Sequence, residues 1–174
     1  KTNLWKPLWN TILLAVFTCT ISIIYGGTFA FLVTRTNLKF KKYLSSIFIF
    51  PYIMPQWTLA VVWQNVFNSN AVVGTSNGLL ASLAGICMPK WWCQGLFPSS
   101  VVLGLHYAPF AYILIGGIFR NMDANLEEAA TILDTPKLKT MFRITLPMVK
   151  PAILSTILLV FGSAMGSYPV PHYL

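Results

Sequence analysis

The sequence "LWNTILLAVFTCTISIIYGGTFAFLV", residues 8–33, contains no charged side chain. A helix crosses the hydrocarbon core of a bilayer with about 17 to 25 apolar residues, and it satisfies its own backbone polar groups. This segment is therefore predicted to be a transmembrane helix, and the chain is predicted to be an integral membrane protein.

Three further apolar blocks are long enough to cross a bilayer, at residues 45–67, 99–119 and 151–167. With 56% hydrophobic and only 9% charged residues, the chain is too apolar for a soluble domain of this size. We expect an all-α fold, a bundle of about four membrane helices that forms one domain over residues 1–174. Because no Met opens the chain and it breaks off soon after the last block, we expect a fragment truncated at both ends.

Lysine and arginine are distributed unevenly between the two sides of the predicted bundle. Segments 35–42 and 120–150 together hold nine of them, whereas the other side holds only Lys1, Lys6 and Lys90. The positive-inside rule then predicts that 35–42 and 120–150 are cytoplasmic and that 68–98 is an extracytoplasmic loop. Topology thus accounts for the net charge of +8, and nucleic-acid binding is not expected because no basic face is built on a soluble element.

Two sequences within the spans bear on helix packing. The small residues of "YGGTFAF", residues 25–31, would let another helix approach closely, either in ordinary packing or in a dedicated dimer contact. In "FPYIMPQW", residues 50–57, Pro51 and Pro55 remove backbone hydrogen bonds and predict a kink or a broken turn. Such a helix either lines or gates a pathway, or is simply kinked where it packs.

Titrating side chains are scarce within the predicted spans. His106, in "GLHYAPFAY", is the only readily titrating one, and it either contacts a substrate or gate or is a neutral histidine hydrogen-bonded between helices. Pro109, in the same stretch, is a further pathway candidate, and His172 is expected at the outer interface. The spans contain no carboxylate, which argues against a proton-coupled or ion-coupled carrier.

The chain also lacks the groups that would let it supply chemical energy. It contains no phosphate-binding loop, no metal-ligand cluster and no set of nucleophile, base and acid. We therefore predict a protein that is not an enzyme and has neither a cofactor nor a metal site of its own. If it transports a solute, the energy must come from a partner.

The outer segment 68–98 carries aromatic and sulfur side chains. Trp91 and Trp92 are expected to anchor the chain at the headgroup level, the alternative being a docking site for an outside partner. Cys87 and Cys93 lie on the side where an oxidising environment permits a disulfide, and a bridge and free thiols are equally compatible with the sequence.

All four acidic residues of the chain lie in the cytoplasmic segment, between residues 123 and 134. Asn125 and Glu128 have the spacing of a capping box, which predicts a short helix with its acids in the first turn. Asp134 suits the turn that follows, and a second helix is expected from Pro136 until Leu146 and Pro147 end it. The short helix would be stabilised by docking into a groove, the alternative being a solvated loop.

The sequence "EEAATILDTPKLKTMFRITLPMVKPAI", residues 127–153, resembles the EAA motif of the permease subunits of binding-protein-dependent ABC importers. The opening of that motif matches Glu128, Ala129 and Ala130, and its close matches Ile144, Leu146 and Pro147. Asp134 stands where the family has Gly. The resemblance implies that an ATPase-coupling role falls on these residues: Glu127, Glu128, Ala129, Ala130, Asp134, Leu146 and Pro147.

The resemblance also implies a fold and partners. It implies a type I importer permease in the bacterial inner membrane, paired with a second permease subunit. It further implies a cytoplasmic ATPase dimer that binds ATP and Mg²⁺, and an extracytoplasmic solute-binding protein. Residues 158–174, "LLVFGSAMGSYPVPHYL", are most similar to ferric-ion and polyamine permeases. A different class stays open, a membrane scaffold that recruits a soluble partner through its cytoplasmic loop without transporting anything.

Overall fold

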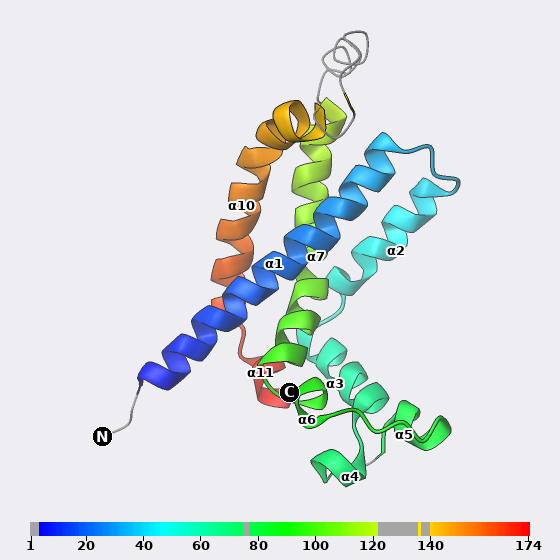
Figure 1. The fold of residues 1–174 in the computed structure, drawn as a ribbon, viewed down its shortest axis with the longest axis vertical. Helices are drawn as coiled ribbons and strands as arrows, with labels where there is room; N and C mark the ends of the chain where they lie inside the picture. Colours follow the sequence, from blue (N-terminus) through cyan, green and yellow to red (C-terminus); the bar gives the residue numbers. More distant parts are fainter. Residues whose placement is uncertain (1–3, 75–76, 122–135, 137–139) are drawn as a thin grey trace.

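The computed structural model describes residues 4–74, 77–121, 136 and 140–174 and, of Phe142, the backbone alone. Within these residues the chain is all-helical (Figure 1). The helices are α1 (Trp5–Arg35), α2 (Lys41–Ile53), α3 (Gln56–Phe67), α4 (Asn70–Val73), α5 (Leu79–Leu83), α6 (Lys90–Cys93), α7 (Leu96–Asn121), the π-helical turn η1 (Met141–Thr145), α10 (Leu146–Met165) and α11 (Pro169–Tyr173).

Four regions match the predicted membrane spans. α1, α7 with the preceding α6, and α10 with the end of η1 are each long and apolar enough to cross a bilayer. α2 and α3 meet the same criterion only as a pair, and they are bent by 99° at the break between them. The prediction of an all-α bundle with about four spans is confirmed, with the second span broken.

α1 and α7 pack closely along their length, and α10 lies beside both (Figure 1). A Cβ atom placed on Gly26 of α1 would lie 2.7 Å from the Cβ of Ala111 and would also meet the carbonyl oxygen of Ala108. In turn, a Cβ on Gly104 of α7 would lie 2.6 Å from the Cγ2 of Ile21. The small residues of "YGGTFAF" therefore serve packing between two helices of this chain, as the first interpretation of them predicts.

The buried side chains form two clusters along the bundle. One joins α1, α2, α7 and α10 around Tyr112 and Phe119, and within it the rings of Phe29 and Phe48 stack with centroids 4.0 Å apart. The other joins α1, α3, α7, α10 and α11 around Leu103 and Tyr107. The two clusters hold α2 against one half of the bundle and α3 against the other half.

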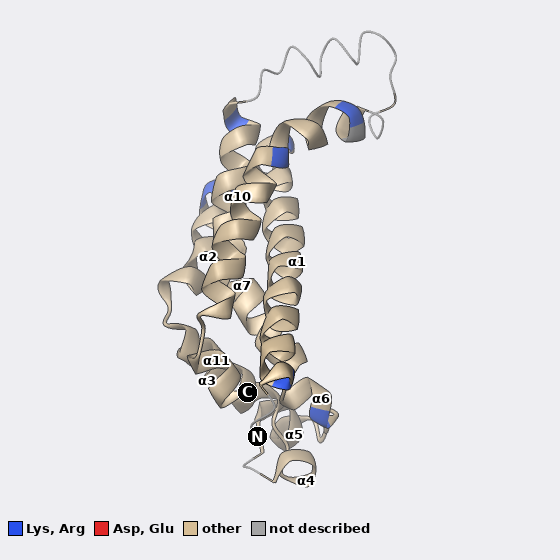
Figure 2. Cartoon of the chain, turned by 90° about the vertical axis from the view of Figure 1, so that its left-hand side faces the viewer, with Lys and Arg blue, Asp and Glu red and all other residues tan. Residues whose placement is uncertain are grey.

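Lysine and arginine gather at the ends of the helices, mostly at the end where α1 and α7 finish and α10 begins (Figure 2). Arg35 lies in the last turn of α1, Arg120 in the last turn of α7, and Arg143 in η1. The fold thus brings the described parts of the two segments predicted to be cytoplasmic to one end of the bundle. α4, α5 and α6, which belong to the predicted outer loop, lie at the other end (Figure 1).

The predicted end of a cytoplasmic helix at Leu146 and Pro147 is wrong. These residues are the first two of α10, which follows directly on η1, and Pro151 lies inside α10. The physical reason is that the π-helical turn η1 leads directly into α10 with helical backbone angles, so the chain stays helical through Pro147 at the loss of one backbone donor. The last span therefore runs from Arg143 to Met165, and it begins earlier than the apolar block predicts.

Candidate functional site

The break between α2 and α3 lies deep in the chain's second span. Met54 has extended backbone angles, φ −74° and ψ 142°, and Pro55 has φ −57° and ψ 139°. A proline disfavours helical angles in the residue before it, and its own nitrogen cannot donate a hydrogen bond. α2 continues past Pro51 to Ile53, so Pro55 ends the helix, as the broken-turn prediction requires.

His106 of α7 contacts this break directly. In an unbroken helix the carbonyl oxygen of Pro51 would accept a hydrogen bond from the nitrogen of residue 55, and Pro55 has no hydrogen to donate. The Nδ1 atom of His106 lies 3.0 Å from that carbonyl oxygen. Because a carbonyl can only accept, His106 donates through Nδ1, and the fold joins two of the predicted pathway candidates in one hydrogen bond.

Aromatic rings surround the imidazole of His106, which is only 5% exposed. The ring centroid of Tyr52 lies 5.5 Å from that of His106 and 4.7 Å from that of Phe110. Pro109 is buried in α7 three residues beyond His106, and it deprives the carbonyl of Leu105 of its helical donor. The structure therefore supports the second interpretation of His106, a histidine that is hydrogen-bonded between two helices.

Gln56, at the start of α3, is a functional candidate that sequence reasoning missed. Its Nε2 donates to the hydroxyl oxygen of Tyr107, at 2.6 Å, and its Oε1 accepts from the hydroxyl of Ser167, at 2.8 Å. One amide therefore joins the start of α3, the middle of α7 and the linker between α10 and α11. Its signal in the sequence was an amide directly after a helix-breaking proline within an apolar block.

A second contact joins α3 to α11. The side-chain amide of Gln64 donates to the backbone carbonyl of Tyr173. With the bridge through Gln56, α3 is tied at both of its ends to the segment that follows α10. α3 and α11 are therefore held together on the same side of the break.

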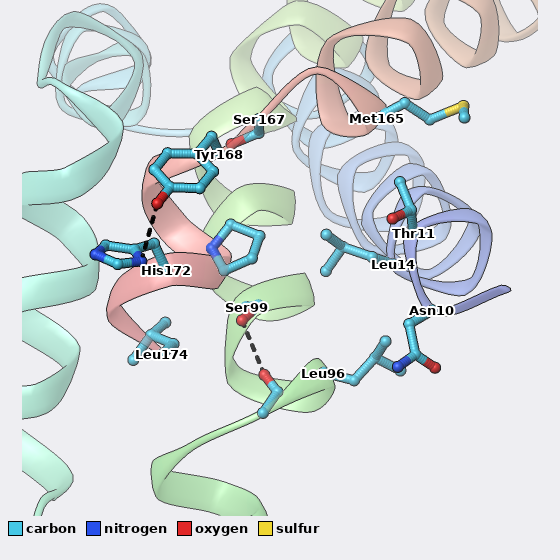
Figure 3. Close-up of a pocket in the computed structure, with 12 residues that line it drawn as sticks. Asn10, Thr11, Leu14, Leu96, Ser99, Met165, Ser167, Tyr168, His172 and Leu174 are labelled. Atoms are coloured by element: carbon cyan, nitrogen blue, oxygen red, sulfur yellow. Dashed lines mark hydrogen bonds between the residues drawn. The ribbon is translucent and has the colours of Figure 1, made fainter. Parts of the chain in front are cut away.

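A cavity of about 520 Å³ lies between α1, the start of α7 and α11 (Figure 3). Ser167 lines it, so its wall extends to the residue that binds Gln56. The Tyr168 hydroxyl and the Nδ1 atom of His172 also lie on it, 3.2 Å apart. The exposed His172 is consistent with the interfacial position predicted for it. The full lining is Asn10, Thr11, Leu14, Gly95, Leu96, Ser99, Met165, Ser167, Tyr168, Pro171, His172 and Leu174.

The two tryptophans of the outer segment differ in their surroundings. Trp91 is 59% exposed, as expected of an interfacial anchor. Trp92 packs among the rings of Trp63, Phe67 and Phe97, and its backbone carbonyl accepts a hydrogen bond from the indole nitrogen of Trp63. Trp92 thus fixes the outer loop to the end of α3.

Cys87 and Cys93 are both free thiols in the structure. The sulfur of exposed Cys87 accepts from the hydroxyl of Ser69, at 3.2 Å, and that of buried Cys93 donates to the carbonyl of Phe67, at 3.2 Å.

Most of the predicted coupling residues, Glu127, Glu128, Ala129, Ala130 and Asp134, lie outside the described residues. Leu146 and Pro147 are described and begin α10 at the end of the bundle that carries most of the basic residues. Leu146 is 44% exposed, so its side chain is open to a neighbour at that end.

Residues 22–174 match the protein family described as the binding-protein-dependent transport system inner membrane component. The spermidine/putrescine transport system permease protein PotB of Haemophilus influenzae is 28% identical, over 99% of this chain and 61% of the relative. The molybdate/tungstate permease protein WtpB of Pyrococcus abyssi is 28% identical, over 86% and 52%. The maltose/maltodextrin permease protein MalF of Yersinia pestis is 30% identical, over 81% and 27%. The chain thus spans less than two thirds of the length of these relatives.

Proposed function

Since the chain belongs to the family of binding-protein-dependent transport system inner membrane components, we propose that it is a permease subunit of an ABC importer. The family and the apolar helices make it a multi-pass protein of the inner membrane. Its proposed task is to form part of the path through which a solute crosses that membrane.

The observation that carries the proposal is the break in the second span and the hydrogen bonds made at it. His106 of α7 donates to the carbonyl of Pro51 before the break, and Gln56 after the break bonds to Tyr107 and Ser167. Irregular backbone at membrane depth is tolerated where protein or water, not lipid, surrounds it, and transporters use broken helices at their solute paths. The bend of 99° leaves α2 and α3 as separate segments, and α3 is tied to α11. We propose that α3 and α11 move together about this break and open or close the path toward the cavity of about 520 Å³ that lies between α1, the start of α7 and α11.

The chain itself is not proposed to hydrolyse ATP. The proposed source of energy is a cytoplasmic ATPase dimer that binds ATP and Mg²⁺ and docks on segment 120–150, where Glu127, Glu128, Ala129, Ala130 and Asp134 would form the coupling helix and its turn. Leu146 and Pro147, at the start of α10, would carry the motion of that segment into the membrane. A second permease subunit and an extracytoplasmic solute-binding protein complete the proposed assembly.

The names of the relatives do not select one solute. Relatives of comparable identity are named for a polyamine, an oxyanion, a sugar and ferric ion. We propose polyamines and ferric ion as the first solutes to test, because residues 158–174 resemble the corresponding stretch of permeases of those two kinds.

The proposal is tested with the full-length permease reconstituted in proteoliposomes with its ATPase and its solute-binding protein. We expect uptake that requires both ATP and the solute-loaded binding protein. Glu128→Lys should abolish uptake and ATPase co-purification while the permease still inserts. Asp123→Lys makes the same charge change outside the EAA match and should preserve both. A Glu128→Lys variant with normal uptake and ATPase binding would refute the coupling role, and uptake of no solute would favour the scaffold function.

A further inference from the structure

A second cavity, of about 480 Å³, lies at the end of the bundle that carries most of the basic residues. It is bounded by three membrane spans and by η1. Its lining residues are Gly27, Thr28, Phe31 and Leu32 of α1, Phe119 of α7, Met141 and Thr145 of η1, and Leu146 and Val149 of α10. We refer to it as the inner groove.

The surface of the inner groove is almost entirely apolar. Phe119 and Val149 are buried beneath it, whereas Phe31, Leu32 and Leu146 are 36%, 44% and 44% exposed along it. The hydroxyl of Thr28 donates to the carbonyl of Ile24 within α1, at 2.7 Å, so it is already satisfied. This surface suits a hydrocarbon chain better than a polar solute.

Cationic side chains stand beside the inner groove. The guanidinium carbon of Arg35 lies 5.9 Å from the ring centroid of Phe119, which lines the groove. Arg143 is exposed and lies in η1 between Met141 and Thr145, which also line it. On this side the sequence has nine Lys and Arg against four Asp and Glu, so positive charge remains in excess even when every acid is paired.

We propose that the inner groove binds an anionic phospholipid of the cytoplasmic leaflet, with an acyl chain in the groove and the phosphate beside Arg143 and Arg35. Within the bilayer the acyl chain gains van der Waals contacts with the groove, and the phosphate neutralises part of the excess charge. Basic residues at the cytoplasmic ends of membrane helices favour anionic over zwitterionic headgroups. Arg143 is therefore a headgroup-selecting residue.

The native tryptophans make a direct test practicable. All six lie in the first turns of α1, in α3 or in α6, and none lines the inner groove. A Phe31→Trp substitution places one reporter in the groove, and its quenching is read as the difference from the unsubstituted permease, because exposed native tryptophans such as Trp91 also contact lipid. The full-length permease is assembled in nanodiscs that contain phosphatidylglycerol or phosphatidylcholine with brominated acyl chains, which quench tryptophan on contact.

We expect the Phe31→Trp reporter to be quenched more strongly by brominated phosphatidylglycerol than by brominated phosphatidylcholine. Adding Arg143→Gln should lower the preference for phosphatidylglycerol about fivefold, the effect expected of one cation near an anionic surface. Adding Lys39→Gln, a cation in the α1–α2 linker that is not part of the groove, should leave the preference unchanged. Equal quenching by the two lipids, or the same preference with Arg143→Gln, would overturn the proposal.

An unquenched reporter would also overturn it, because it would mean that a protein segment, such as a helix of a second permease subunit, fills the inner groove. A second measurement avoids the tryptophan substitution. Mass spectrometry of lipid retained by the purified permease should show phosphatidylglycerol enriched over the membrane average. Arg143→Gln should remove that enrichment and Lys39→Gln should preserve it, and the proposal fails if Arg143→Gln retains it.

Discussion

The Nδ1 atom of His106 donates to the carbonyl oxygen of Pro51, 3.0 Å away, at the place where Pro55 has removed the helical donor. A side chain of α7 thus replaces the hydrogen bond that the second span lost when it broke. The break is stabilised from outside its own helix, which is what a defined hinge needs at a depth where water is scarce.

Removal of the imidazole should destabilise the permease. His106→Ala leaves the Pro51 carbonyl without a donor, and we expect a cost of about 1 to 2 kcal/mol in the free energy of unfolding. Unfolding of the purified permease in detergent, followed by tryptophan fluorescence, measures it. His172→Ala, at an exposed histidine, serves as the control. Equal stability of the two variants would contradict the assigned role of His106.

Pro55 gives a sharper version of the same test. Pro55→Ala restores a backbone N–H group that can donate to Pro51, so the contribution of His106 should fall. A double-mutant cycle of His106→Ala and Pro55→Ala should show a coupling of about 1 kcal/mol. Additive effects would show that His106 does not act through this carbonyl.

Gln56 should matter for transport more than for insertion. Gln56→Leu removes both the bond to Tyr107 and the bond from Ser167, so the start of α3 loses its side-chain link to α7 and to the linker after α10. We expect solute-stimulated ATPase activity of the reconstituted importer to fall at least tenfold, while membrane insertion is retained. Tyr107→Phe and Ser167→Ala each remove one of the two bonds and should give intermediate losses. The bridge has no such role if Gln56→Leu behaves like the wild type.

The close contact of α1 and α7 predicts different effects at two adjacent glycines. Gly26→Ala forces a methyl group against Ala111 and the backbone of Ala108, and we expect a cost of about 1 to 3 kcal/mol. A Cβ on Gly27 would find its nearest neighbour, the Cδ1 of Ile115, at 3.4 Å, so Gly27→Ala should be nearly neutral. Thermal unfolding in detergent should give a lower melting temperature for Gly26→Ala than for Gly27→Ala. Equal melting temperatures of the two variants would contradict this packing.

Cys87 and Cys93 provide a test of topology and of the disulfide hypothesis together. A membrane-impermeant maleimide added from the outer side should label the exposed Cys87 of intact cells and leave the buried Cys93 unlabelled. Labelling of Cys87 only from the cytoplasmic side would reverse the predicted orientation. If a bridge forms instead, neither thiol reacts until a reductant is added.

The spans were predictable because length and apolarity are local properties of the sequence. The break was predictable too, since Pro51 and Pro55 act on their own helix. The hydrogen-bond partners of the residues at the break were not predictable. His106 lies 55 residues from Pro51, and Ser167 lies 111 residues from Gln56. An orphaned carbonyl can be foreseen in a sequence, but its donor depends on how the helices pack.

Leu146 and Pro147 show a different limit of the sequence. A proline there is compatible with the end of one helix and with the first turn of the next. The apolar block beginning at Pro151 favoured the former, yet the helix starts at Leu146, where hydropathy alone gives no signal.

The central claim is that α3 moves relative to α2 about the break at Pro55 during the transport cycle. The most direct measurement is the distance between spin labels at exposed Ile47 of α2 and exposed Val62 of α3 in the full-length permease, reconstituted with its ATPase and binding protein. Pulsed electron paramagnetic resonance should give different distance distributions in the nucleotide-free and the vanadate-trapped states. The same distribution in both states, in an importer that transports, would contradict the account.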